Sequence, residues 1–160
     1  MLRKAAVLFF ILIGISCADQ LAYSSFQTIP DGRWRRDSTL TFEVEAPDTT
    51  QAHTFYLYVR NDNDYPYSNL FLIADFTRPD GTSQRDTLEY EMADAQGNWL
   101  GSGLGSVKES KLGYKKDVVF PTKGVYTFTV SQAMRKNGSV EGIEELPGIL
   151  DVGLQIEKNE

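Results

Sequence analysis

Apolar and polar residues alternate strictly over short runs that recur along most of this chain. In the run TLTFEVE (39–45), Leu40, Phe42 and Val44 fall on one face, and threonine and glutamate residues fall on the other. A period of two residues is that of a β-strand with one buried face. Such runs can bury their apolar side chains only by pairing into sheets, and this requirement constrains the fold more than any other feature.

Six further runs have strand character, at 54–60, 69–76, 83–92, 116–120, 124–134 and 149–157. The turn sequence RPDG (78–81) joins two of them into a hairpin. One short helix is expected after Ser106, because Ser106 and Glu109 have capping-box spacing and Gly113 would end the helix. The sequence therefore predicts an all-β fold: an antiparallel two-sheet β-sandwich, Ig-like or jelly-roll-like, of about seven or eight strands with one short helix.

The N-terminus has the composition of a secretory signal. Arg3 and Lys4 precede an apolar run of 11 residues, 5–15, whereas a membrane-spanning helix needs about 20. The only cysteine, Cys17, follows directly after the small residue Ser16. In one interpretation Cys17 is discarded or left as a free thiol. In the other its thiol receives a diacylglyceryl group, the signal is cut just before it, and the acylated cysteine becomes the first residue of a bacterial lipoprotein; we expect the second.

These features divide the chain into three parts. We expect a lipoprotein signal peptide at 1–16, a lipidated N-terminus and tether at 17–37, and the β-sandwich domain at 38–160. Within the tether, a short strand is expected around 23–27. Removing residues 1–16 leaves 14 basic and 22 acidic residues, a net charge of −8. This acidic balance argues against nucleic acid as a partner.

Catalytic and metal-binding patterns are weak. The only histidine, His53, is expected to be exposed at a strand edge. The acidic loop containing Asp62 and Asp64 does not follow the EF-hand pattern, so we expect a solvated turn and no metal. The glycine-rich segment 99–106 fails both phosphate-loop patterns and is expected to be a sharply bent loop. No cofactor is expected, and a hydrolase built on two carboxylates is a distant possibility because no pair stands out.

Aromatic residues are the remaining candidates. Tyr65 and Tyr67 flank Pro66 in a loop, Trp99 precedes the glycine-rich segment, and Trp34 lies among three arginines. Such residues either cap the open ends of a sandwich core or form a recognition surface. We take Tyr65, Tyr67 and Trp99 as a candidate interaction surface, and Cys17 as the lipid attachment site.

Four long segments carry a resemblance to a known family. They are VRNDNDYPYSNLFL (59–72), DGTSQRDTLEYEMADAQGNWLGSGLG (80–105), GVYTFTVSQAMR (124–135) and EELPGILDVGLQIE (144–157). Over nearly its whole mature length the chain resembles the gliding motility lipoprotein family GldH of Bacteroidetes. The resemblance implies a cell-envelope component of the gliding machinery and its associated secretion apparatus, with no enzymatic activity and no catalytic residues. Only Cys17 carries over with a defined role.

The expected location and role follow from this resemblance. Surface-exposed lipoproteins of this phylum carry clustered acidic residues after the cysteine, whereas here Asp19 stands alone. We therefore expect the periplasmic face of a membrane, the outer rather than the inner one. The expected function is a non-enzymatic structural or interaction component that contacts the membrane through its lipid and contacts other envelope proteins. The alternative is a carbohydrate- or peptidoglycan-binding β-sandwich on a lipid tether.

Overall fold

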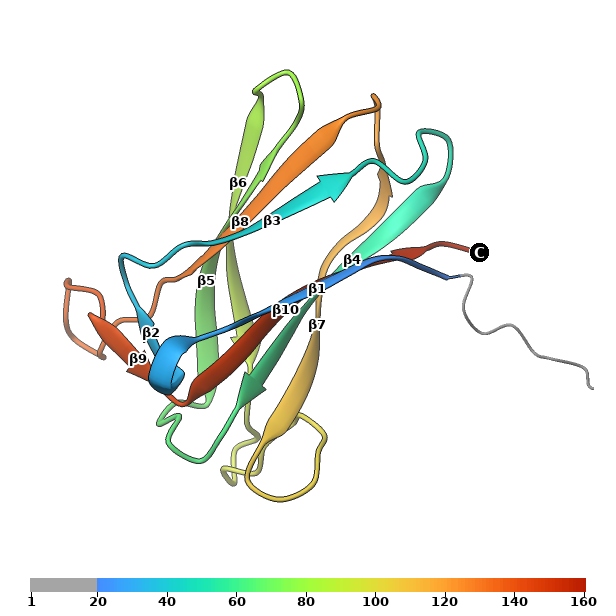
Figure 1. Ribbon diagram of the computed structural model, residues 1–160. Coiled ribbons are helices and arrows are strands. Elements are labelled where there is room, and N and C mark those ends of the chain that lie inside the picture. The colour runs from blue at the N-terminus through green and yellow to red at the C-terminus, as the bar shows by residue number, and fades with distance from the viewer. Residues whose placement is uncertain (1–19) are drawn as a thin grey trace, which may run out of the picture.

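The strands form two four-stranded antiparallel sheets and one two-stranded sheet. The structure is a computed structural model and describes residues 20–160, so the expected signal peptide and Cys17 lie outside the described residues. The elements, shown in Figure 1, are β1 (Leu21–Thr28), the 3₁₀ turn η1 (Pro30–Gly32), β2 (Arg33–Arg35), β3 (Leu40–Glu45), β4 (Ala52–Asn61), β5 (Asn69–Thr77), β6 (Ser83–Glu91), β7 (Lys108–Val119), β8 (Val125–Gln132), β9 (Glu145–Pro147) and β10 (Ile149–Lys158).

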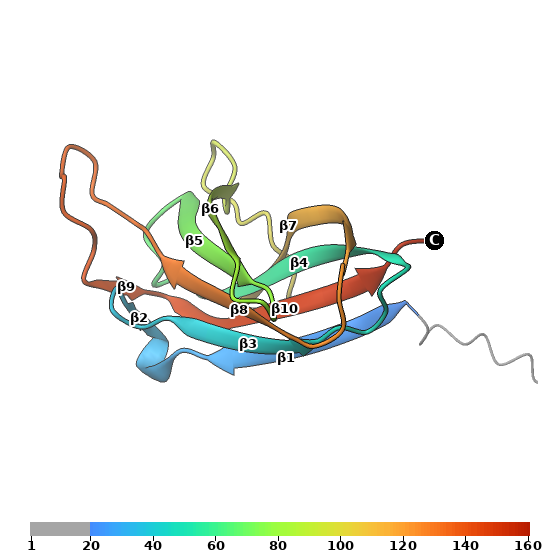
Figure 2. The same cartoon turned by 90° about the horizontal axis from the view of Figure 1, so that it is seen from above.

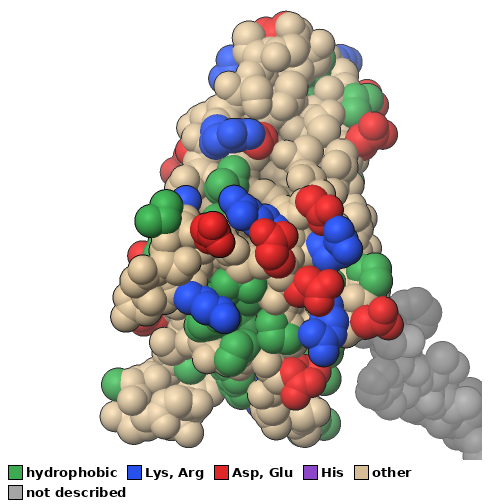
Figure 3. Space-filling model, turned by 90° about the vertical axis from the view of Figure 1, so that its left-hand side faces the viewer, with side chains coloured by type: hydrophobic (Ala, Val, Ile, Leu, Met, Phe, Trp, Pro, Cys, Tyr) green, Lys and Arg blue, Asp and Glu red, His purple; other side chains and the backbone are tan. Residues whose placement is uncertain are grey.

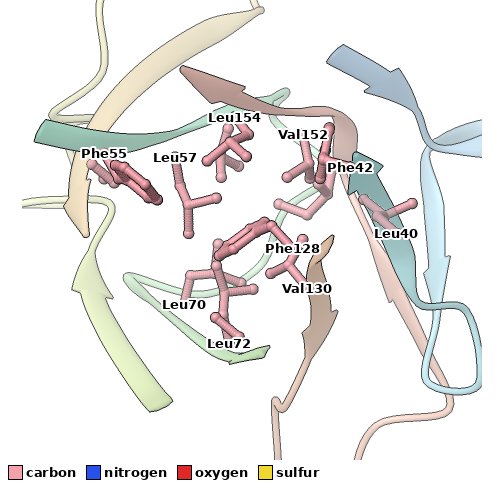
Figure 4. Close-up of a cluster of buried hydrophobic side chains, with 14 of the residues drawn as sticks. Leu40, Phe42, Phe55, Leu57, Leu70, Leu72, Phe128, Val130, Val152 and Leu154 are labelled. Carbon is pink, nitrogen blue, oxygen red and sulfur yellow. The ribbon is translucent and has the colours of Figure 1, made fainter. Parts of the chain in front are cut away.

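The two large sheets enclose a single apolar core. One sheet has the order β1-β10-β4-β7 and the other β3-β8-β5-β6, while β2 and β9 pair at one end. Inward side chains from both sheets meet in the middle, as Figure 4 shows for Phe55 and Leu154 from one sheet and Leu70 and Phe128 from the other. The prediction of an all-β fold with antiparallel sheets is confirmed.

Alternation explains why these segments are strands. In β4 every second residue from His53 to Asn61 is buried, and β5 buries Leu70, Leu72, Ala74 and Phe76 in the same way. Each buried apolar side chain contributes roughly 1.5–3 kcal/mol relative to exposure. A register shift of one residue would turn the entire apolar set of a strand to solvent, so this pattern fixes the pairing.

The short helix expected after Ser106 is wrong. Residues 108–119 form β7, which pairs with β4 and turns Ser110 and Leu112 inward. Gly113 lies within this strand opposite Tyr56 instead of ending a helix. The capping-box spacing is a weak local preference, and tertiary pairing along a buried neighbour strand overrides it. The only helical element in residues 20–160 is the 3₁₀ turn η1.

The segment expected to be a tether contributes strands to the fold. The short strand expected at 23–27 is longer, since β1 spans Leu21–Thr28 and pairs along β10. β2 follows after η1 and pairs with β9. Within residues 20–160, no helix is long and apolar enough to cross a membrane.

The sandwich has two distinct ends. β1 begins beside the C-terminus, where the Lys158 amide donates to the Gln20 carbonyl at 2.7 Å. At this end Figure 1 shows the start of β1 next to the end of β10. The connections β4–β5, β6–β7 and β8–β9 lie at the opposite end, and the β8–β9 connection projects from the body (Figure 2). The chain therefore enters the domain far from these three connections.

His53 is buried, and the expectation that it is exposed is wrong. Its side chain is 0% exposed on the inward face of β4, and its ring packs edge-on against Phe120 at 5.3 Å between centroids. Neither ring nitrogen has a hydrogen-bond partner. The alternation that buries Phe55 and Leu57 also determines the inward register of His53.

Replacing His53 by leucine is expected to raise the free energy of unfolding at neutral pH by about 1 kcal/mol. The volume is nearly kept, while two buried polar atoms without partners are removed. Urea unfolding measures the change, with His53→Ala as the cavity control, which we expect to lose about 2 kcal/mol or more. A loss with leucine as large as that with alanine would contradict this expectation.

Candidate functional site

A cleft of about 600 Å³ opens at the end of the sandwich that lies far from residue 20. We call it the aromatic cleft. It lies between the β4–β5 connection, the β8–β9 connection and β9, and its lining residues are Pro66, Tyr67, Lys136, Ser139, Glu141, Gly142, Ile143, Glu144, Glu145 and Pro147. Figure 3 shows hydrophobic side chains gathered in the lower half of this face, with acidic and basic side chains around them.

The three aromatic residues proposed from the sequence meet beside this cleft. Tyr65 packs edge-on against Tyr67 with ring centroids 5.8 Å apart, and on its other side it lies 6.2 Å from the Trp99 ring. Trp99 also donates from Nε1 to Asn63 Oδ1 at 3.2 Å. Tyr67 and Trp99 are half-buried, so both offer ring surface to a partner.

Tyr65 supports this surface from below and does not belong to it. It is 2% exposed, and its hydroxyl donates to the Asn69 carbonyl at 2.6 Å. Burial, with a smaller contribution from Tyr67, raises the pKa of the Tyr65 phenol, which stays a neutral donor. Tyr65 therefore caps the end of the core and is not part of an exposed recognition surface.

Gly148 holds the β4–β5 connection against the rest of the site. Its carbonyl accepts from the Asp62 amide at 3.0 Å, and its amide donates to the Gly32 carbonyl at 2.9 Å. A Cβ at this position would come within 2.5 Å of the Tyr65 Cα. With φ at +81°, Gly148 also adopts a conformation that other residues reach only with strain. Tyr65 can therefore occupy its position only because residue 148 has no side chain.

Trp34 anchors the other wall of the cleft. It is buried in β2 opposite Leu146 of β9, and its Nε1 donates to the Ser38 carbonyl at 3.0 Å. Trp34 therefore caps the core. The pairing of β2 with β9 places Glu145 and Pro147, and with them the strand that lines the cleft.

The basic spot around Trp34 is largely compensated by neighbouring acids. Each arginine has a guanidinium nitrogen near a carboxylate oxygen. The distances are 2.8 Å for Arg35 and Asp37, 3.5 Å for Arg36 and Glu144, and 3.9 Å for Arg33 and Glu145. All six side chains are at least half exposed, so each pair contributes little to stability. Their effect is to leave no uncompensated positive patch on this wall.

Several acids around the aromatic residues have no such partner. None of the ion pairs found in residues 20–160 involves Asp62, Asp64, Asp94 or Glu141. Hydrogen bonds from Asn98 lower the pKa of the Asp94 carboxyl, which is therefore ionised at neutral pH. These acids outnumber Lys136, the one basic residue that lines the cleft.

The glycine-rich segment is an ordered loop, as expected. We call residues 99–107 the Leu104 loop. Ser102 and Glu109 exchange two backbone hydrogen bonds of 2.9 and 2.7 Å, and Lys108 Nζ donates to the Gly103 carbonyl at 2.7 Å. The loop is thereby fastened to the start of β7 next to Trp99.

Asp62 and Asp64 form a turn. Asp62 Oδ1 accepts from the Asp64 amide at 2.9 Å, the geometry of an Asx turn. In the part of the chain that the structure describes, no group of three or more histidine, cysteine, aspartate or glutamate side chains is placed to hold a metal ion.

The family assignment comes from comparison with known proteins. The sequence profile of the GldH lipoproteins matches residues 21–156, which include the whole aromatic cleft and every strand apart from the last two residues of β10. This chain belongs to the GldH lipoprotein family. The resemblance noted from four sequence segments is therefore confirmed over nearly the entire described domain.

Two relatives support the assignment over almost their whole length. The gliding motility lipoprotein GldH homolog of Christiangramia forsetii is 46% identical over 153 residues, which cover 96% of this chain and 93% of that protein. Gliding motility lipoprotein GldH of Flavobacterium johnsoniae is 39% identical over 159 residues, covering 99% and 95%. Both relatives carry the GldH name, and each match covers almost the whole of both chains.

Likeness to solved structures is loose. The VP2 subviral particle of infectious bursal disease virus overlaps 96% of this chain and 37% of that chain, with a TM-score of 0.38 and 14% identity. A structural similarity this low supports no statement about function.

Proposed function

We propose that this protein is a lipid-anchored, non-enzymatic component of the gliding machinery that binds another cell-envelope protein through its aromatic cleft. The family supports the lipid anchor and the gliding role, because both relatives are named gliding motility lipoproteins. The observation that carries the binding role is the cleft itself, which Tyr67 lines beside apolar and charged side chains, together with the half-buried Trp99 ring next to Tyr65.

The composition of the cleft suits a protein partner. Aromatic side chains at the centre with charged side chains at the rim are the usual anatomy of a protein interface. Tyrosine and tryptophan supply large contact areas at low entropic cost, since each has only two rotatable side-chain bonds. The relatives' names give no support to the carbohydrate-binding alternative, and we do not propose it.

The site is directed away from the proposed anchor. Cys17 is separated from β1 by three residues, while the cleft lies at the opposite end of the sandwich. A lipid on Cys17 would therefore leave the cleft accessible to envelope proteins. We place the domain on the periplasmic face of the outer membrane. Loss of the domain when intact cells are treated with protease would contradict this location.

We also infer a sandwich of the jelly-roll type. Every connection between successive strands of the two large sheets crosses from one sheet to the other, apart from the β5–β6 hairpin. Eight strands in two four-stranded sheets with this connectivity are typical of jelly rolls, whereas Ig sandwiches contain more hairpins within a sheet.

Replacing Tyr67 or Trp99 by alanine is expected to reduce recovery of the partner at least tenfold, because aromatic side chains at the centre of an interface contribute about 2 kcal/mol or more. The measurement is quantitative mass spectrometry of proteins recovered with the full-length lipoprotein from gently solubilised membranes. Tyr56→Ala is the matched control, since Tyr56 is a half-buried tyrosine on the outer face of the β1-β10-β4-β7 sheet, under Lys111. Equal losses with all three variants would refute the proposal.

A further inference from the structure

We propose that the Leu104 loop is a preformed contact that inserts Leu104 into an apolar pocket of the partner, and that lysine or arginine side chains surround this pocket. The inference rests on the proposed function, because it concerns the same partner as the aromatic cleft. It adds a second, protruding contact beside the cleft and specifies the chemistry of the surface that receives it.

The loop presents apolar side chains where polar ones are usual. Leu104 is 99% exposed and Leu100 is 57% exposed, and Val107 is also exposed. No residue from Ala95 to Val107 carries a charge. Single exposed leucines are common on protein surfaces, but an uncharged run of this length with several exposed apolar side chains is a surface suited to burial by a partner.

The loop holds Leu104 in place without burying it. Besides the hydrogen bonds that join Ser102 to Glu109 and Lys108 to Gly103, the Leu100 amide donates to the Met92 carbonyl at 2.9 Å. Gly103 lies so close to the last residue of the loop that a Cβ there would be 2.5 Å from the Val107 carbonyl oxygen. A loop fastened in this way loses little further conformational entropy on binding.

A protein pocket fits these observations better than a lipid surface does. Burying one leucine side chain improves a binding constant by roughly 10- to 100-fold, which is substantial within a larger protein interface. The charges around the loop are also unsuited to anionic lipid. Lys108 is one cation at the base of the loop, and the Gly103 carbonyl accepts from its ammonium. Three acids outside the ion pairs outnumber it: Asp94 belongs to the same connection, and Asp62 and Asp64 flank Asn63, which binds Trp99. This excess of acids favours basic side chains on the partner.

The test places a photo-reactive amino acid at position 104 of the full-length lipoprotein in native membranes and identifies the crosslinked peptide by mass spectrometry. Position 125 is the control, because Val125 is 46% exposed at the other end of the sandwich. We expect the adduct at 104 to lie in an apolar segment of an envelope protein with lysine or arginine next to it. An adduct with lipid alone, or with a second copy of this chain, would overturn the proposal.

Affinity measurements distinguish this proposal from the proposed function. Leu104→Ser is expected to reduce recovery of the crosslinked protein at least tenfold, while Val125→Ser leaves it unchanged. Recovery should also fall when the ionic strength is raised, because dissolved ions screen the attraction between the acids near the loop and the basic side chains of the partner. If Tyr67→Ala reduces recovery and Leu104→Ser does not, the cleft remains the binding site and the role of Leu104 is refuted. Recovery that is independent of salt would refute the basic surroundings of the pocket.

Discussion

Cys17→Ser is expected to move the protein almost completely from the membrane fraction to the soluble fraction, with the domain still folded. Each methylene of an acyl chain contributes about 0.8 kcal/mol when it is buried in a bilayer, so two or more chains anchor a protein stably and their loss removes the attachment. Serine cannot take the thioether-linked lipid. Cell fractionation and flotation in a density gradient measure the distribution.

Ser16→Ala is the matched control for this experiment. Alanine keeps a small residue directly before Cys17, so processing and membrane retention are expected to continue. Retention of the Cys17→Ser variant in the membrane fraction would refute lipid attachment at this position. Release of both variants would show that the loss of membrane retention is not specific to the Cys17 thiol.

The proposed lipid on Cys17 and the fold together restrict how the domain can be oriented on a membrane. Three residues, 18–20, separate Cys17 from β1 and reach at most about 10 Å when fully extended. β1 then runs along the sandwich for eight residues, roughly 26 Å. With the lipid in a bilayer, the end containing Val125 lies close to the surface, and the aromatic cleft and the Leu104 loop lie well beyond it.

Strand positions follow from the sequence wherever one face of a strand is buried. The runs around Phe42, Leu57 and Leu72 alternate, and β3, β4 and β5 occupy them within a few residues. The same alternation gives the buried register of His53, although its loop neighbours favour an exposed edge. The run at 116–120 predicts only the end of β7. The spacing of Ser106 and Glu109 is a local signal that favours a helix over the first part, whereas the strand there depends on pairing with β4 across a long stretch of chain.

The aromatic half of the site could be proposed from composition, whereas the cleft could not. Tyr67 and Trp99 stand out as aromatic residues in loops, and the structure brings them together around Tyr65. The opposite wall, including Ile143 and Pro147, is positioned by the pairing of β2 with β9, two strands of three residues each. Strands this short carry no periodicity, so no signal in the sequence separates them from loops.

Gly148→Ala is expected to reduce the free energy of unfolding by about 3 kcal/mol or more and to displace the β4–β5 connection. The left-handed backbone conformation alone costs a non-glycine residue about 1–2 kcal/mol. The added methyl group also overlaps the backbone of Tyr65, which forces a shift that costs a further 1–3 kcal/mol or so. Urea unfolding measures the loss, and partner recovery reports the damage to the cleft.

Gly81→Ala separates the two causes. Gly81 has a φ of +85°, almost the same as Gly148, but a Cβ there meets no atom within 4 Å. The control therefore shows the conformational cost alone, about 1–2 kcal/mol, and should leave partner recovery intact. For the unfolding measurements both variants are made in the Cys17→Ser background, so that no detergent is needed, whereas partner recovery is measured with the variants that keep Cys17. If Gly148→Ala lost no more stability than Gly81→Ala, the close packing of Gly148 on Tyr65 would not be what positions the aromatic residues. A larger loss together with reduced recovery would show that the rings of the cleft depend on a glycine that lies outside the lining of the cleft.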